Sequence, residues 1–180
     1  MQAVSRSPHL PAGWTLIEFM VVLVVMALLL GVGVPAFARL IEKQRVIVAS
    51  TDLHGAMFLA RSQAIHRNRR VTICTSSDGV QCHSALGWHG GWMVFEDVNA
   101  NAVADPGETV VLVRQSAASG VHITGNAPVR DYVSYTPIGA ARMKNGALQM
   151  GTITLCAGES GRQIVINAAG RPRVVRQHQC

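Results

Sequence analysis

The chain has 180 residues, a net charge of +6 and only 5% aromatic residues. Once an apolar N-terminal segment is set aside, about 140 residues from Arg39 to Cys180 remain, which suffices for one compact domain and requires no second one. The low aromatic content excludes a core built mainly from aromatic side chains, so we expect Val, Ile and Ala there. The excess of 16 basic over 10 acidic residues is compatible with a polyanionic partner.

The first feature along the chain is an apolar run of twenty residues, Phe19 to Ala38, without a charged side chain. As a helix it would extend about 30 Å, the thickness of the hydrocarbon core of a bilayer. Every face of that helix is apolar, so we predict a membrane-spanning segment over residues 14–38. Residues 1–13 contain Arg6 and no acidic residue. Positively charged flanks of a membrane segment tend to stay in the cytoplasm, so we expect these residues there and the C-terminal domain on the exported side.

Two processing schemes are compatible with this segment. In the first, an ordinary signal peptide is cleaved after the small-x-small sequence of residues 36–38, and a soluble domain is released. In the second, a leader ending at Gly13 is removed on the cytoplasmic side, and the apolar helix is retained as an anchor that begins at Trp14. Glu18 favours the second scheme, because a carboxylate in a membrane segment costs roughly 2.5–3.5 kcal/mol and needs a partner. The new amino group at Trp14, on the same subunit or on a neighbour, would supply that partner one helical turn away.

The sequence from Gly13 to Glu18, Gly-Trp-Thr-Leu-Ile-Glu, is followed directly by the apolar helix. It resembles the class III leader and N-terminus of type IV pilins and of the pseudopilins of type II secretion. That family usually has Phe after the Gly, so Trp14 is a conservative departure. The resemblance implies cleavage after Gly13 by a prepilin peptidase, N-methylation of Trp14, and assembly with other pilins through the N-terminal helix, with Glu18 guiding subunit docking.

Beyond the membrane, residues 39–70 repeat apolar residues at helical spacing and predict the amphipathic half of the same helix. The stripe consists of Leu53, Met57, Ala60 and Ala64. Residues 71–180 contain short β-rich runs separated by turn sequences, and short connections predict antiparallel pairing. The runs are Val71–Cys74, Trp92–Phe95, Val110–Arg114, Val121–Thr124, Tyr132–Tyr135, Thr152–Cys156, Gln163–Asn167 and Arg173–Val175. The predicted fold class is α+β, with one long N-terminal helix packed on a C-terminal antiparallel β-sheet domain.

Four cysteines lie on the exported side, where an oxidising compartment favours two disulfides. We expect a Cys74–Cys82 bond that closes a short loop and a Cys156–Cys180 bond that holds the C-terminus against a strand. The alternative is a zinc site in which His83 and His89 join the first two cysteines. No Cys-x-x-Cys pair supports that site.

A loop after the second predicted strand has oxygen-bearing side chains at positions 1, 3, 5, 9 and 12 of a twelve-residue segment. They are Asp97, Asn99, Asn101, Asp105 and Glu108. This is the ligand spacing of a calcium loop. The EF-hand, however, requires Gly at position 6, where this chain has Ala102, and its loop follows a helix. We favour a hairpin connection whose Asn and Asp side chains cap its own turns, and we expect no cofactor.

The C-terminal sequence Gly170-Arg171-Pro172-Arg173 is followed closely by Arg176. Pro172 favours an extended conformation of Arg171, so the side chains of Arg171 and Arg173 would project from one side, about 7 Å apart. Two guanidinium groups so placed can each bind a phosphate. Arg162 and Arg176 could widen this patch. The alternative is a surface turn with solvated arginines.

The stretch from Cys74 to Glu108, the helical sequence LARSQAI and the C-terminal sequences TLC and GRPR resemble the GspH/FimT minor pilins and pseudopilins. In FimT-like members, a Gly-Arg-x-Arg motif at this place is associated with DNA binding during natural transformation. The resemblance implies this role for Gly170, Arg171 and Arg173. Contact would be mainly with the DNA backbone and largely independent of sequence.

We therefore interpret the chain as a minor pilin with one span in the inner membrane and its C-terminal domain in the periplasm. It would enter a type IV pilus at low copy and present its arginine turn to DNA. The alternative is a structural, H-type minor pseudopilin of a type II secretion system, and only the arginine motif separates the two interpretations. No nucleophile, base and orienting acid form a motif, so we expect no enzyme.

Overall fold

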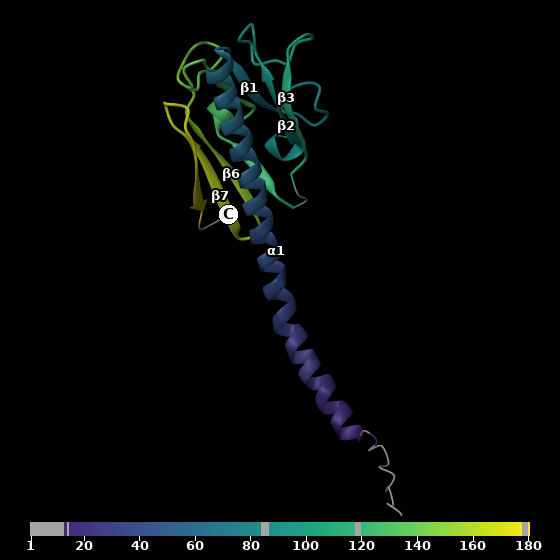
Figure 1. The fold of residues 1–180 in the computed structure, drawn as a ribbon. Helices are drawn as coiled ribbons and strands as arrows, with labels where there is room; N and C mark the ends of the chain where they lie inside the picture. The colour runs from purple at the N-terminus through teal and green to yellow at the C-terminus, as the bar shows by residue number, and fades with distance from the viewer. Residues whose placement is uncertain (1–12, 14, 84–86, 118–119, 178–179) are drawn as a thin grey trace, which may run out of the picture. The chain divides into compact units, whose positions relative to one another are not determined.

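The computed structural model describes residues 13, 15–83, 87–117, 120–177 and 180. Its helical elements are α1 (Leu16–Arg67) and two short 3-10 helices, η1 (Gly87–Gly90) and η2 (Ala127–Val129) (Figure 1). Its strands are β1 (Val71–Thr75), β2 (Gly91–Glu96), β3 (Val110–Gln115), β4 (His122–Gly125), β5 (Tyr132–Tyr135), β6 (Gly151–Ala157), β7 (Ser160–Ile166) and β8 (Pro172–Gln177). The chain forms two compact units, residues 1–38 and 39–180.

The N-terminal unit contains the apolar part of α1. Residues from Phe19 to Val34 are exposed, apart from the half-buried Gly33, so no other described segment of the chain covers this part of the helix. Among the described residues, α1 is the one helix that is long and apolar enough to cross a membrane. The helix is not interrupted at Pro35. This segment therefore has the length and composition expected of an anchor.

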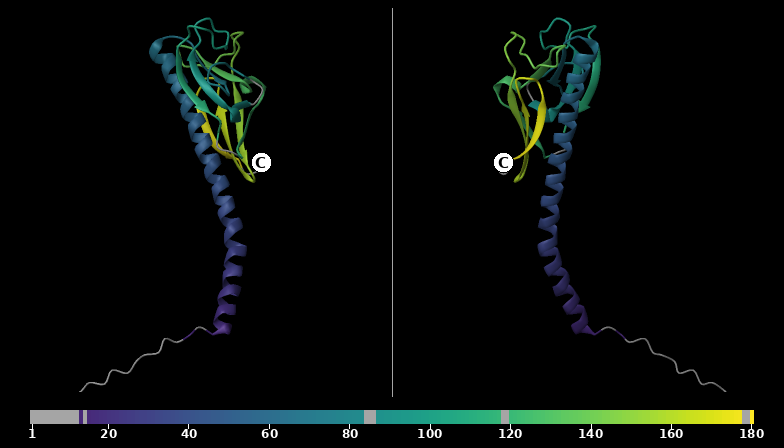
Figure 2. Two further views of the ribbon diagram at one scale, coloured as in Figure 1. Left: turned by 90° about the vertical axis from the view of Figure 1, so that its right-hand side faces the viewer. Right: turned by 60° about the vertical axis from the view of Figure 1, so that its left-hand side comes forward.

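The C-terminal unit contains two four-stranded sheets. Sheet A has the strand order β3-β2-β1-β5 and sheet B has the order β4-β6-β7-β8, and every pairing is antiparallel. Within this unit the second half of α1 lies alongside the sheets (Figure 2). The predicted α+β class, a long helix packed on antiparallel sheet, is confirmed. The sequence did not predict the division into two sheets, because alternation indicates which face of a strand is buried and not which strands are neighbours.

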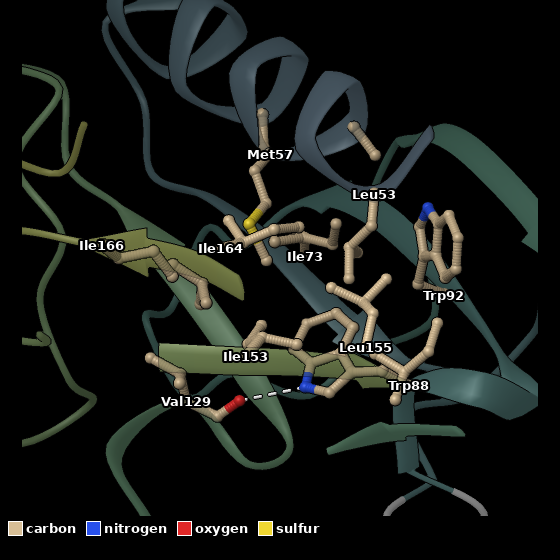
Figure 3. Packing of buried hydrophobic residues seen from close by; sticks show 14 of the residues in the cluster. Leu53, Met57, Ile73, Trp88, Trp92, Val129, Ile153, Leu155, Ile164 and Ile166 are labelled. Atoms are coloured by element: carbon tan, nitrogen blue, oxygen red, sulfur yellow. Dashed lines mark hydrogen bonds between the residues drawn. The ribbon is translucent and has the colours of Figure 1, made fainter. Parts of the chain in front are cut away.

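The main core lies between α1 and the two sheets. The predicted stripe of Leu53, Met57, Ala60 and Ala64 is fully buried. Leu53 and Met57 point toward side chains of both sheets, which Figure 3 shows. These partners include Ile73 of sheet A and Ile153, Leu155 and Ile164 of sheet B. The indole nitrogen of Trp88 donates a hydrogen bond of 3.0 Å to the carbonyl of Val129 in the same region (Figure 3).

Every buried hydrophobic residue in the described part of the chain lies between Val46 and Ile166. Both disulfides also lie beyond residue 70. A fragment of residues 39–180 therefore contains the complete core and all of its covalent cross-links. We expect this fragment to fold without the apolar half of α1.

A second, smaller core covers the outer face of sheet A. It consists of Cys74, Met93 and Phe95, against which Cys82, Ala104 and Tyr132 pack. As a result all five residues of β1 are buried, because both faces of the strand are covered. The segments that supply this cover are the disulfide loop after β1 and the loop after β2. These loops therefore belong to the folded domain and are not simple connections.

Replacing Leu53 by Ala should lower the free energy of unfolding of the 39–180 fragment by about 2–5 kcal/mol. The reason is that Leu53 has no exposed surface and contacts both sheets. Phe58→Ala, on the same helix but 59% exposed, should change it by no more than about 0.5 kcal/mol. Urea unfolding of both variants measures the difference. Equal losses would contradict the assignment of the buried face of α1.

Candidate functional site

Glu18 caps the start of α1. Its carboxylate accepts hydrogen bonds from the backbone N–H of Thr15 at 2.8 Å and from the Thr15 hydroxyl at 3.1 Å. The backbone N–H of Glu18 donates to the Thr15 hydroxyl oxygen at 3.3 Å. This reciprocal arrangement is a capping box, and the Thr-x-x-Glu sequence could have predicted it. Gly13 is described in the structure, whereas Trp14, the predicted site of methylation, lies outside the described residues.

The predicted calcium-loop carboxylates accept hydrogen bonds from the loop itself. Asp97 is fully buried and accepts from the Thr72 hydroxyl at 2.8 Å and from the backbone N–H groups of Asn101 and Ala102. The side chains of Asn99 and Asn101 donate to Asp105, each at 2.8 Å. Glu108 likewise accepts from two backbone N–H groups, those of residues 98 and 105. The carboxylates thus fold this loop over the second core, as the hairpin alternative predicted.

The disulfides connect Cys74 with Cys82 and Cys156 with Cys180, the two pairs expected from the sequence. Their Cα atoms lie 5.7 and 5.8 Å apart. The first bond removes the thiolates that the alternative zinc site required. The second lies against Gly161, where an added Cβ would come within 2.5 Å of the Cys180 sulfur. A glycine at that position therefore makes room for the bond.

The turn between β7 and β8 carries Arg171 and is held tightly. The backbone N–H of Gly170 donates to the carbonyl of Asn167 at 2.9 Å, and the N–H of Arg171 donates to the Asn167 side chain at 2.9 Å. Gly170 has a φ of 72°, and an added Cβ would lie 2.4 Å from the carbonyl oxygen of Gly139. That same carbonyl accepts a hydrogen bond from Arg61 on α1. Gly170 is thus required both by its positive φ and by this close approach.

The start of β8 is also fixed to α1. His54, on the helix, forms a hydrogen bond of 3.2 Å with the carbonyl oxygen of Pro172. The backbone on either side of Arg171 is therefore restrained, while the side chains of Arg171 and Arg173 are exposed. Restrained backbone with exposed guanidinium groups suits the binding of an external anion, because little backbone entropy remains to be lost.

The predicted basic residues fall on two faces of sheet B. Directly paired residues share a face, and side chains alternate along a strand. Arg162 pairs with Arg176, and the neighbouring pair on the same face, Ile164 with Val174, packs into the main core. Arg173 pairs with Val165 and therefore projects from the opposite, outer face. The structure thus separates Arg162 and Arg176 from the patch that we expected them to widen.

The basic residues also differ in their partners. Arg67 forms an ion pair with Glu96, and Arg130 forms one with Asp131. By contrast, the guanidinium groups of the four predicted DNA-binding arginines have no ion pair or hydrogen bond with any residue that the structure describes. They are Arg162, Arg171, Arg173 and Arg176. Their charge is therefore not neutralised by the part of the chain that is described.

Among the described residues outside the predicted membrane-spanning segment, two titratable groups have clearly shifted pKa values, and both lie away from these arginines. Backbone N–H groups of Gln81 and Val80 donate to Asp78 and hold the pKa of its carboxyl below the usual range. Burial raises the pKa of the Tyr135 hydroxyl, which the nearby positive charge of Arg61 partly offsets. Both groups keep their usual charge state at neutral pH, so neither supplies an acid or base for chemistry there.

The arrangement of one long helix on antiparallel sheets is the pilin fold. The crystal structure of the type IV minor pilin FimU from Pseudomonas aeruginosa superposes with a TM-score of 0.55, over 76% of this chain and 90% of that chain. A second crystal form of FimU gives a TM-score of 0.51 and covers 74% of this chain. Sequence identity is 18% in both cases, so this likeness concerns the fold alone.

The model of the family described as type II transport protein GspH matches residues 49–170, and the chain belongs to that family. The pilin-like protein PilA1 of Thermus thermophilus is 28% identical over 172 residues, which covers 90% of this chain and 97% of that protein. The resemblance inferred from the sequence is confirmed. The chain is therefore a minor pilin or pseudopilin, a structural protein that associates with other pilins in a filament. Its single apolar helix fits an inner-membrane anchor with a periplasmic domain.

Gly170→Ala should destabilise the 39–180 fragment by more than the cost of positive φ alone, because the new methyl group would meet the backbone at Gly139. Gly146→Ala is the matched control, since Gly146 has a φ of 84° and nothing within 4 Å of an added Cβ. We expect a loss of about 1–2 kcal/mol for the control and a clearly larger loss at Gly170. Equal losses in urea unfolding would show that the turn does not pack against the 139–141 segment.

Proposed function

We propose that this protein is a minor pilin that enters a type IV pilus at low copy and binds DNA for natural transformation. The observation that carries the proposal is the pair Arg171 and Arg173, exposed beside a turn that Gly170 and Asn167 hold rigid. Two such guanidinium groups can each bind a phosphate of the DNA backbone. Binding would be largely independent of base sequence and strongly dependent on salt.

In this proposal the N-terminal segment carries the steps of maturation and assembly. A prepilin peptidase cleaves the leader, residues 1–13, after Gly13, and Trp14 is methylated. Residues 14–38 then span the inner membrane, and residues 39–70 and 71–180 form the periplasmic helix and β domain. Glu18 pairs with the amino group of a neighbouring subunit and sets the register of the packed helices.

The second candidate function is that of a structural, H-type minor pseudopilin in a type II secretion system. The description of the matching family, type II transport protein GspH, favours it. In that role the arginine turn would be a solvated surface feature, and the protein would act only through packing with other pseudopilins. The two candidates share the anchor and the fold, so a test of DNA binding separates them.

The oxidised 39–180 fragment should bind duplex DNA. Arg171→Gln/Arg173→Gln should weaken that binding, and the slope of log K against log salt concentration should fall in magnitude by about two, one phosphate contact for each arginine. Arg114→Gln/Arg130→Gln is the matched control, because it removes two exposed arginines from other parts of the domain. Fluorescence anisotropy across a salt series gives both quantities. If the unchanged fragment fails to bind even at low salt, or if the control loses as much, the DNA-binding role is abandoned and the pseudopilin role is preferred.

Glu18→Gln in the full-length protein should abolish incorporation into filaments while leaving membrane insertion unchanged. The amide can still accept the hydrogen bonds of Thr15, so the variant removes the charge and keeps the cap. Thr15→Ala is the reverse control, since it removes the capping hydroxyl and keeps the carboxylate. Immunoblots of membranes and of sheared filaments measure the two steps. An equal defect in Thr15→Ala would assign the effect to the helix cap rather than to the charge.

A further inference from the structure

A groove of about 530 Å³ lies between α1 and the ends of β7 and β8. Its helix side is formed by Lys43, Gln44, Val46 and Ile47, and its sheet side by residues 159–162 with Arg176 and Gln177. Three cations, Lys43, Arg162 and Arg176, therefore face this groove together with one carboxylate, Glu159. The volume is in the range of sites that hold a small ligand.

Arg162 and Arg176 are directly opposite each other across the β7–β8 pair. Like charges in such cross-strand positions repel one another. Within the described residues, no carboxylate comes within 4.0 Å of either guanidinium group, and Glu159 forms no ion pair with them. The fold thus brings two unneutralised cations together on the face of sheet B that is turned toward α1. An anion between them would remove the repulsion and accept hydrogen bonds from both.

The helix side of the groove begins only a few residues along the chain after the predicted membrane segment. Lys43 follows Ala38, the last residue of the apolar run, by five residues of the same helix. At the rise of an α-helix this is a separation of about 7.5 Å. That distance is within one Debye length of about 8 Å at physiological ionic strength, over which basic residues are attracted to anionic lipids. Phospholipid headgroups at the end of the predicted span are therefore within electrostatic reach of Lys43.

We propose that the groove binds the phosphate of an anionic phospholipid headgroup, with Arg162 and Arg176 as its principal ligands and Lys43 as a third cation. Val46 and Ile47 form an apolar side of the groove, which suits the glycerol and upper acyl carbons of a lipid. The site is distinct from the proposed DNA contact, because Arg173 projects from the other face of sheet B.

The test uses the oxidised 39–180 fragment, which contains the complete core but no membrane anchor, so that vesicle binding reports the groove. The fragment should co-sediment with vesicles of phosphatidylcholine containing phosphatidylglycerol and not with phosphatidylcholine alone. Arg162→Gln/Arg176→Gln should weaken this binding about 30-fold, the factor expected for two cations at an anionic surface. Arg171→Gln/Arg173→Gln removes the same charge from outside the groove and should weaken it less than about threefold.

A second measurement distinguishes loss of the binding site from loss of folding in the double variant. The soluble headgroup glycerophosphoglycerol should raise the urea midpoint of the unchanged fragment, because it binds only the folded state, and should not raise that of Arg162→Gln/Arg176→Gln. The proposal is overturned if anionic vesicles fail to bind, or if both double variants lose vesicle binding equally. Displacement by inorganic phosphate as effective as that by glycerophosphoglycerol would also overturn it, since the site would then recognise phosphate alone.

The same variants keep the two proposals distinguishable. Loss of DNA binding in Arg171→Gln/Arg173→Gln, with vesicle binding retained, supports both. Loss of DNA binding in Arg162→Gln/Arg176→Gln instead would make the groove a nucleic-acid contact and overturn the lipid site. Absence of DNA binding with selective vesicle binding would remove the DNA role and leave the lipid site supported.

Discussion

Burial of one face of α1 is the constraint on which the rest of the β domain depends. Leu53 and Met57 fill the space between two sheets that share no strand, so the helix is the element that joins them into one core. The same helix supplies His54 to the start of β8 and Arg61 to the segment that receives the β7–β8 turn. Both proposed sites lie on strands whose position is set by this packing. The second half of α1 is thus a structural support for the sites as well as part of the filament helix.

The two halves of α1 differ in what covers them. Between Val46 and Ala64 one helical face is buried by the domain, whereas no other described part of the chain covers the side chains from Phe19 to Val34. Exposed apolar surface of that extent is not stable in water and requires lipid or other helices. A carboxylate in such an environment also needs a partner, and Thr15 satisfies only one of its oxygens. The other oxygen accepts no hydrogen bond from the residues that the structure describes, so it is open to the intersubunit pairing that we propose for filament assembly.

The sequence predicted all eight strands, the buried stripe of α1 and both cysteine pairs, because each depends on local pattern or on spacing along the chain. It did not predict the two sheets, since strand neighbours depend on packing at long range. The loop after β2 has the residue types of a calcium site. In the structure, however, the carboxylate of Asp97 accepts hydrogen bonds from the buried Thr72 hydroxyl and from backbone N–H groups. Only the fold brings Thr72 next to Asp97, so the sequence could not predict this contact. The Thr-x-x-Glu pattern of the capping box was present in the sequence, but for Glu18 we expected only the Trp14 amino group, of the same subunit or of a neighbour, as its partner.

The arginines illustrate how strand register determines function. Arg162 lies on β7, and Arg173 and Arg176 lie on β8, the second strand of the same hairpin. From the sequence alone we placed all three in one patch. The pairing of Arg162 with Arg176 places those two on the helix side of sheet B, and the alternation of side chains places Arg173 on the other. A cation on the outer face can approach a large polyanion, whereas the pair on the helix side lines a groove against α1 that suits a small anionic group. One basic hairpin can in this way serve two different phosphate ligands, because the sheet itself keeps the two sites apart.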